Sequence, residues 1–237
     1  MARASAIVTD IEGTTTRISF VKDVLFRHAN DQIPRYLREH RSDPRVVAIL
    51  EDVREHEHDP SLDEDAIVAL FCRWIDEDRK VTPLKAIQGY VWAEGYRAGL
   101  FHGHVYEDAA AHLRQWHARG IGLYVFSSGS VVAQRDLFAH TVHGDLSRLF
   151  SGFFDTTTGP KRKPSSYASI AAAIGIAPSA ITFLSDTAEE LDAAREAGMT
   201  SICLDRGEGA IDAKGHPCAR DFGEVDSLLA GPSSAHH

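Results

Sequence analysis

Two carboxylates, Asp10 and Glu12, stand one residue apart at the end of a short apolar run. Residues 6–9 have the character of a buried strand, and Gly13 with two threonines follows the carboxylates. Such a strand would deliver Asp10 to the edge of a sheet, while the glycine allows a sharp turn and the threonines offer hydroxyl and N–H groups to an anion. The pattern indicates phosphoryl transfer, with Asp10 as nucleophile and Glu12 as the group that handles protons. Taken alone, it is also compatible with a turn or a helix cap.

Two serines with suitable chemistry follow a second apolar run. Ser127 and Ser128 come after residues 122–126 and before a helical pattern. Hydroxyl and N–H groups at the start of a helix bind phosphate, although serine is equally good as an ordinary helix cap. We therefore expect these serines at the same edge of the sheet as Asp10.

Three charged residues complete the set. Lys161 lies in a loop before a helical pattern, where a lysine meets an anion or is simply solvated. Asp186 follows the apolar run 181–184, and Glu190 comes four residues later, a spacing that helical geometry would place nearby. The alternative is that Asp186 is a helix cap and Glu190 a surface acid. Suitable groups at four separate strand ends or loops favour one shared site over four coincidences.

The apolar runs alternate with helical patterns, and the resulting strands and helices would position the candidate site residues. Strands are expected at 6–9, 122–126, 181–184 and 201–204, and helices at 106–120, 164–174 and 189–198. Strands alternating with helices predict an α/β fold, a Rossmann-like, doubly wound parallel sheet with right-handed crossovers. In such sheets ligands bind at the carboxyl ends of the strands. All of the candidate residues fall there.

Residues 19–102 differ, because they lack strand patterns and are typical of successive amphipathic helices. The expected helices are 21–39, 43–55, 63–78 and 83–98. We therefore expect an α/β catalytic core formed by residues 1–18 and 103–237, with residues 19–102 inserted as an all-helical cap. A cap of this kind can exclude water and add substrate contacts.

Composition excludes several classes of protein. The chain has 237 residues, is 43% hydrophobic and has a net charge of -9, so a nonspecific nucleic-acid binder is not expected. Three cysteines without CxxC spacing indicate a reduced cytoplasmic protein without structural zinc. We expect no signal peptide, because the first apolar run ends at Asp10, and no membrane span, because no stretch approaches about 18 apolar residues.

Together the candidate residues resemble the haloacid dehalogenase-like superfamily, whose phosphatases use an Asp nucleophile, a Ser/Thr, a Lys and a distal acid around Mg²⁺. The chain is similar in more detail to the enolase-phosphatase family of methionine salvage. Glu12 is the most specific point, since most phosphatases of the superfamily carry Asp there. The resemblance extends from about Ile7 to Leu204 and rests on residues 10–16, 20–26, 95–96, 103–105, 127–131, 133–134, 154–156, 159–161 and 183–186. Pro160 and the basic residues after Lys161 depart from the family pattern.

The resemblance implies a function, a cofactor and roles for the residues. The substrate would be 2,3-diketo-5-methylthiopentyl-1-phosphate, a small phosphorylated diketone that is enolised and then dephosphorylated to the acireductone. Asp10 would form an aspartyl-phosphate, Glu12 would act as acid and base, and Ser127, Ser128 and Lys161 would bind phosphate. One Mg²⁺ per chain would be held by Asp10, the Glu12 carbonyl and Asp186, with Glu190 behind them. We expect a monomer.

Several points stay open from the residues. The enolisation base is Glu12 or a cap residue such as Lys85 or Glu94. The run 55–59, rich in acidic residues and histidine, is either a metal site or, more commonly, a solvated helix end. Three aromatic residues either form the core of the cap or contact the methylthio group of the substrate: Trp74, Trp92 and Tyr96. A general phosphatase acting on sugar or glycolate phosphates shares every core residue and is the alternative function.

Overall fold

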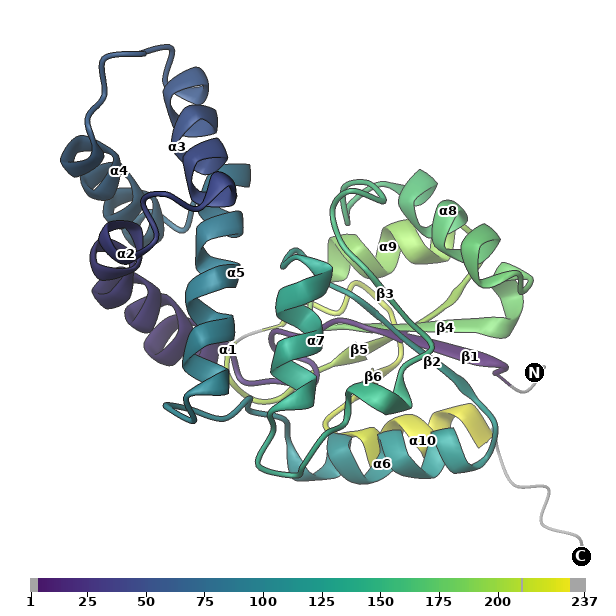
Figure 1. Ribbon diagram of the computed structural model, residues 1–237. Helices are drawn as coiled ribbons and strands as arrows, with labels where there is room; N and C mark the ends of the chain where they lie inside the picture. Colours follow the sequence, from purple (N-terminus) through teal and green to yellow (C-terminus); the bar gives the residue numbers. More distant parts are fainter. Residues whose placement is uncertain (1–3, 210, 231–237) are drawn as a thin grey trace, which may run out of the picture. The chain divides into compact units, whose positions relative to one another are not determined.

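A computed structural model describes residues 4–209 and 211–230; the stretch after Ala230, expected to be loosely ordered, lies outside the described residues, as do His236 and His237. The chain divides into two compact units (Figure 1). One comprises the residues up to Ile18 and from His102 onward, and the other comprises Ser19–Phe101. None of the helices in the described part is long and apolar enough to cross a membrane.

The first unit is built on a sheet of six described strands, all paired in parallel, in the order β3-β2-β1-β4-β5-β6. The strands are β1 (Ala6–Thr9), β2 (Gly122–Phe126), β3 (Gly152–Phe154), β4 (Ile181–Ser185), β5 (Thr200–Leu204) and β6 (Cys218–Ala219). Every strand predicted from the sequence is present, and the predicted α/β fold class is confirmed. The short strands β3 and β6 were not predicted, because two or three residues carry too little alternation or apolar length to be distinguished from a loop.

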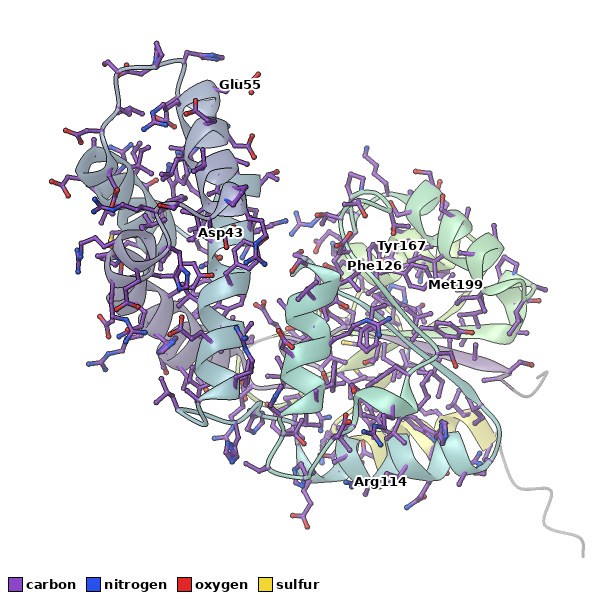
Figure 2. The ribbon with its side chains drawn as sticks, in the orientation of Figure 1. Asp43, Glu55, Arg114, Phe126, Tyr167 and Met199 are labelled. Carbon is purple, nitrogen blue, oxygen red and sulfur yellow. The ribbon has the colours of Figure 1, made fainter. Side chains whose placement is uncertain are left out.

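Helices cover both faces of this sheet, as Figure 1 shows with α6 and α10 on one side and α8 and α9 on the other. The helices are α6 (Glu107–Ala118), α7 (Val131–Ala139), α8 (Pro164–Ile174), α9 (Ala188–Glu196) and α10 (Phe222–Ala230), with 3₁₀ turns at Ser147–Leu149 and Pro178–Ala180. Phe126, Tyr167 and Met199 lie in the buried core beneath α8 and α9 (Figure 2). On the other face the rings of Trp116 and Phe222 stack 5.2 Å apart. This double covering explains why the strands are apolar on both faces.

The central position of β1 determines where Asp10 lies. β1 pairs with β2 on one side and with β4 on the other, so that Thr9 lies opposite Val125 and Leu184. The residues that follow these three strands therefore meet at one edge. This is the carboxyl edge, where the sequence places the candidate site residues.

The second unit is helical in its described residues. The short helix α1 (Ile18–Phe20) leads into it, and its further elements are a π-helix (Val21–Phe26), α2 (Arg27–Glu39), α3 (Pro44–His56), α4 (Glu64–Asp76) and α5 (Thr82–Arg97). Asp43 and Asp63 accept hydrogen bonds from backbone N–H groups in the first turns of α3 and α4, as N-caps do. Buried residues including Trp74, Phe71 and Ile33 give the unit a core of its own.

One helix of this unit differs from its prediction. The helix expected at 21–39 begins as a π-helix and continues as α2 from Arg27. The wider turn leaves backbone carbonyls off the regular α-helical ladder, and Leu25 O accepts a 2.8 Å hydrogen bond from Trp92 Nε1. A hydrophobic period alone does not reveal such a bulge, because the apolar face continues through it.

Candidate active site

Asp10 stands directly after the central strand β1. Its N–H donates to Leu184 O over 2.9 Å, which extends the pairing with β4, and its side chain is 8% exposed. Oδ1 accepts a 2.8 Å hydrogen bond from the N–H of Ile11. The carboxylate is thus held rigidly, with one oxygen oriented by the backbone.

The chain turns sharply after Asp10. Ile11 O accepts N–H groups from Thr14, Thr15 and Thr16 over 2.9–3.3 Å, and Gly13 has a φ of 69°, in the left-handed region. A Cβ atom at Gly13 would lie 2.0 Å from Oδ2 of Asp186. Only glycine permits both the backbone conformation and the close approach of the Asp186 carboxylate.

Lys161 joins two buried carboxylates. Its Nζ lies 2.7 Å from Asp10 Oδ1 and 2.7 Å from Glu190 Oε2, and its side chain is 8% exposed. Burial alone would lower the pKa of Lys161, but the charges of Asp10 and Glu190 outweigh it and raise that pKa. Tyr167 OH donates to Lys161 O over 2.7 Å and secures the loop. Lys161 is therefore a permanent cation next to Asp10.

The two acids that follow β4 have raised pKa values. Burial, and then the charge of Asp10, raise the pKa of Asp186 to about 6. Burial and the Asp10 charge also raise the pKa of Glu190, whose Oε2 accepts a 3.1 Å hydrogen bond from Ser185 Oγ. Because the negative charge of Asp10 disfavours ionisation of both acids, a cation placed among these three carboxylates would be stabilised.

In the loop between β2 and α7, different residues face a ligand and hold the loop in place. Ser127 is 5% exposed, and its Oγ accepts a long 3.4 Å hydrogen bond from Gly129 N, which leaves its O–H proton available to a ligand. Ser130 is the N-cap of α7, accepting from Ala133 N over 3.3 Å. Gln134 Nε2 donates to the carbonyls of Gly129 and Phe154 over 2.7 and 2.9 Å and ties the loop to β3. The loop is thus held in place without using Ser127's donor.

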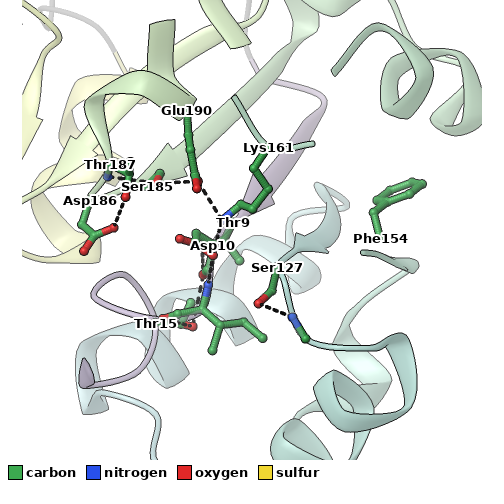
Figure 3. Close-up of polar contacts among 12 residues, drawn as sticks. Thr9, Asp10, Thr15, Ser127, Phe154, Lys161, Ser185, Asp186, Thr187 and Glu190 are labelled. Atoms are coloured by element: carbon green, nitrogen blue, oxygen red, sulfur yellow. Dashed lines mark hydrogen bonds and ion pairs between the residues drawn. The ribbon is translucent and has the colours of Figure 1, made fainter. Parts of the chain in front are cut away.

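Figure 3 shows Asp10 with Lys161, Ser127, Asp186 and Glu190 around it. Glu12 is half-buried in the turn two residues after Asp10, and Ser128 is half-buried beside Ser127. The structure therefore brings together the residues named from four segments far apart in sequence. The sequence did not predict the direct ion pair of Lys161 with Glu190 or the close approach of Asp186 to Gly13.

The donors present fit Mg²⁺. Asp10 and Asp186 supply carboxylate oxygens, the turn supplies a backbone carbonyl at Glu12, and hard oxygen ligands of this kind are what Mg²⁺ prefers. Residues 4–209 and 211–230 contain no group of three or more His, Cys, Asp or Glu side chains that could hold a metal. The run 55–59 accordingly forms no metal site of that kind.

The other candidates lie in the helical unit. Trp74 is fully buried and Tyr96 is 4% exposed, as core residues are, and Trp92 stacks on Phe26. Glu94 pairs with Arg35 over 2.9 Å.

The fold and this site together define a hydrolase, and comparison with known proteins identifies the family. The chain belongs to the haloacid dehalogenase-like hydrolases, whose family model matches residues 4–198. It is 53% identical over 220 residues to "Enolase-phosphatase E1" of Methylococcus capsulatus, which covers 93% of this chain and 96% of the relative. It is also 53% identical to the protein of the same name in Pseudomonas aeruginosa, with 93% and 97% covered.

Solved structures share the fold of this chain. The UTR4 protein of Saccharomyces cerevisiae is 32% identical with a TM-score of 0.77, and the match covers 92% of this chain and 98% of that one. A predicted phosphoglycolate phosphatase from Haemophilus somnus has a TM-score of 0.60 at 18% identity, which shows a shared fold alone.

Proposed function

We propose that this chain is an enolase-phosphatase that converts 2,3-diketo-5-methylthiopentyl-1-phosphate to the acireductone 1,2-dihydroxy-3-keto-5-methylthiopentene, in methionine salvage. The observation that carries the proposal is the 53% identity to enolase-phosphatases, which extends over 93% of the chain and so includes both units. The geometry around Asp10 supports the phosphatase half independently.

Asp10 is the nucleophile in this proposal. Its Oδ1 is held by Lys161 and by the Ile11 N–H, and among the described residues no hydrogen bond is made to its Oδ2. Oδ2 attacks phosphorus, a P–O bond forms, and the bond to the substrate's C1 oxygen breaks. Water then hydrolyses the aspartyl-phosphate, returning Asp10 and releasing phosphate.

Glu12 carries the protons in both steps. It protonates the leaving oxygen and afterwards takes a proton from the attacking water. Lys161 offers a compact positive charge to the phosphoryl group, and Ser127 and Ser128 donate hydrogen bonds to its oxygens. Mg²⁺, held by Asp10, the Glu12 carbonyl and Asp186, supplies charge neutralisation between phosphate and nucleophile when bound.

The helical segment has a separate task in this proposal. Residues 1–18 and 103–237 form the catalytic core, and residues 19–102 form a cap that selects the substrate. The enolisation base is Glu12 or a cap residue such as Lys85 or Glu94. We further propose a cytoplasmic monomer that requires one Mg²⁺ per chain.

The test supplies the diketo phosphate with Mg²⁺ and follows enol absorbance and phosphate release in the same sample. Both signals are expected, with the enol appearing no later than phosphate. Asp10→Asn is the matched control, since it should stop phosphate release. Efficient phosphate release from sugar or glycolate phosphates, without an enol signal from the diketone, would identify a general phosphatase instead.

A further inference from the structure

Arg206, an arginine that the sequence analysis did not assign to the site, binds the turn formed by residues 11–16 after Asp10. Arg206 follows β5 in the loop at the carboxyl edge of the sheet, and its side chain is only 5% exposed. Its Nε donates a 2.9 Å hydrogen bond to Thr14 O. Thr14 belongs to the same turn as Glu12.

The guanidinium is fixed from several directions at once. Nη1 pairs with Asp108 Oδ2 over 2.9 Å and donates to Arg220 O over 3.3 Å. Its central carbon lies 4.2 Å from the ring centroid of Tyr106 and 5.2 Å from that of Phe222. A planar group that contacts two aromatic rings and pairs with a carboxylate has little freedom, so its bond to Thr14 O has a defined direction.

Contacts from outside the turn supplement its internal hydrogen bonds, of which Gly13 N to Thr16 O is the shortest at 2.8 Å. The bond from Thr14 N to Ile11 O is long, 3.3 Å, whereas Tyr106 N donates to Thr15 O over 3.0 Å and Thr16 Oγ1 donates to His104 O over 2.7 Å. Arg206 is the charged member of this set. Its Nη2 is buried and makes no hydrogen bond within the part of the chain that the structure describes.

We propose that Arg206 is a positioning residue that fixes the turn at residues 11–16 through Thr14 O, and thereby places the Glu12 carboxyl where it can protonate the leaving oxygen. The inference rests on the role proposed for Glu12. The role of Arg206 can be tested separately from the proposed function, because a misplaced acid slows the departure of poor leaving groups and leaves the departure of good leaving groups almost unaffected.

The test compares two substrates in Arg206→Lys, which keeps the charge and loses the planar fork and the stacking. With an alkyl phosphate that the wild type hydrolyses, kcat/KM, which reports only the steps up to formation of the aspartyl-phosphate, should fall about 10- to 100-fold, with the loss in kcat and KM within about threefold. With p-nitrophenyl phosphate, whose leaving group departs without a proton, kcat/KM should fall less than about threefold. Arg119→Lys is the control, since Arg119 also pairs with a carboxylate, Asp226, outside the site.

Hydrogen exchange gives a readout that needs no turnover. The amides of residues 11–16 should exchange faster in Arg206→Lys than in the wild type and in Arg119→Lys. Unchanged exchange there would overturn the proposal, as would equal losses of kcat/KM on both substrates or, with the alkyl phosphate, a raised KM at unchanged kcat. A missing enol signal from the diketone defeats the proposed function without altering this comparison, because any alkyl phosphate that the wild type hydrolyses serves.

Discussion

The ammonium of Lys161 lies 2.7 Å from Oδ1 of Asp10, and both side chains are 8% exposed. This pairing is a buried one in which the lysine also binds Glu190. It orients one oxygen of Asp10 and places a fixed positive charge where a phosphoryl group would arrive. The predictions that follow depend on this arrangement and on the turn beside it.

Asp10→Asn should lower phosphate release at least about 10³-fold, because an amide oxygen is a poor nucleophile and no aspartyl-phosphate can form. Rapid quenching followed by mass spectrometry should find phosphate on Asp10 in the wild type and on no residue of the variant. Near-normal phosphate release from Asp10→Asn would rule out the covalent mechanism.

Lys161→Met should destabilise the protein by about 3–5 kcal/mol, because it leaves two buried carboxylates without their cation. Adding Glu190→Gln should restore part of that loss, since one uncompensated charge is then removed. Urea denaturation of the single and double variants measures both effects. Equal stability of the two variants would contradict the claim that Glu190 is left as an uncompensated buried charge.

Gly13→Ala should weaken Mg²⁺ binding at least about tenfold, because a new Cβ displaces Asp186, one of the two carboxylates proposed to hold the ion. Gly120→Ala is the matched control. Gly120 also has a positive φ, 77°, and open space around its added Cβ, so it should cost only the backbone strain of about 1–2 kcal/mol. Calorimetric Mg²⁺ titration separates the two, and identical affinities would contradict the predicted collision.

Asp226→Asn should reduce stability at neutral pH by about 1–2 kcal/mol. Burial raises the pKa of Asp226, but hydrogen bonds from Trp116 and Arg119 outweigh it and the pKa is lowered overall. Its contribution to stability is therefore present above the unfolded pKa of about 3.9 and is lost as pH falls through the lower folded value. The gap between wild type and variant in urea denaturation should close below about pH 4. A gap that persists at pH 2 would show that the carboxylate charge is not responsible.

Much of the core fold was predictable because its signals are local. The apolar runs ending at Asp10, Ser127 and Asp186 are short buried strands, and parallel pairing brings their carboxyl ends to one edge. The strand β6 was not predictable in the same way, since two residues become a strand only by pairing with β5. The position of Arg206 in the sequence could have indicated that it lies near the site, because, like the predicted residues, it closely follows the carboxyl end of a strand.

The sequence by itself determined which chemical groups stand at the ends of the strands, since strand composition and the spacing of Asp10 and Glu12 are properties of neighbouring residues. Only the tertiary structure decided which of those groups touch. Lys161 meets Glu190, Asp186 meets Gly13, and Arg206 meets Thr14 because the order of the strands sets the distance between segments far apart in the chain. No local pattern carries that order, since it results from the packing of both faces of the sheet at once.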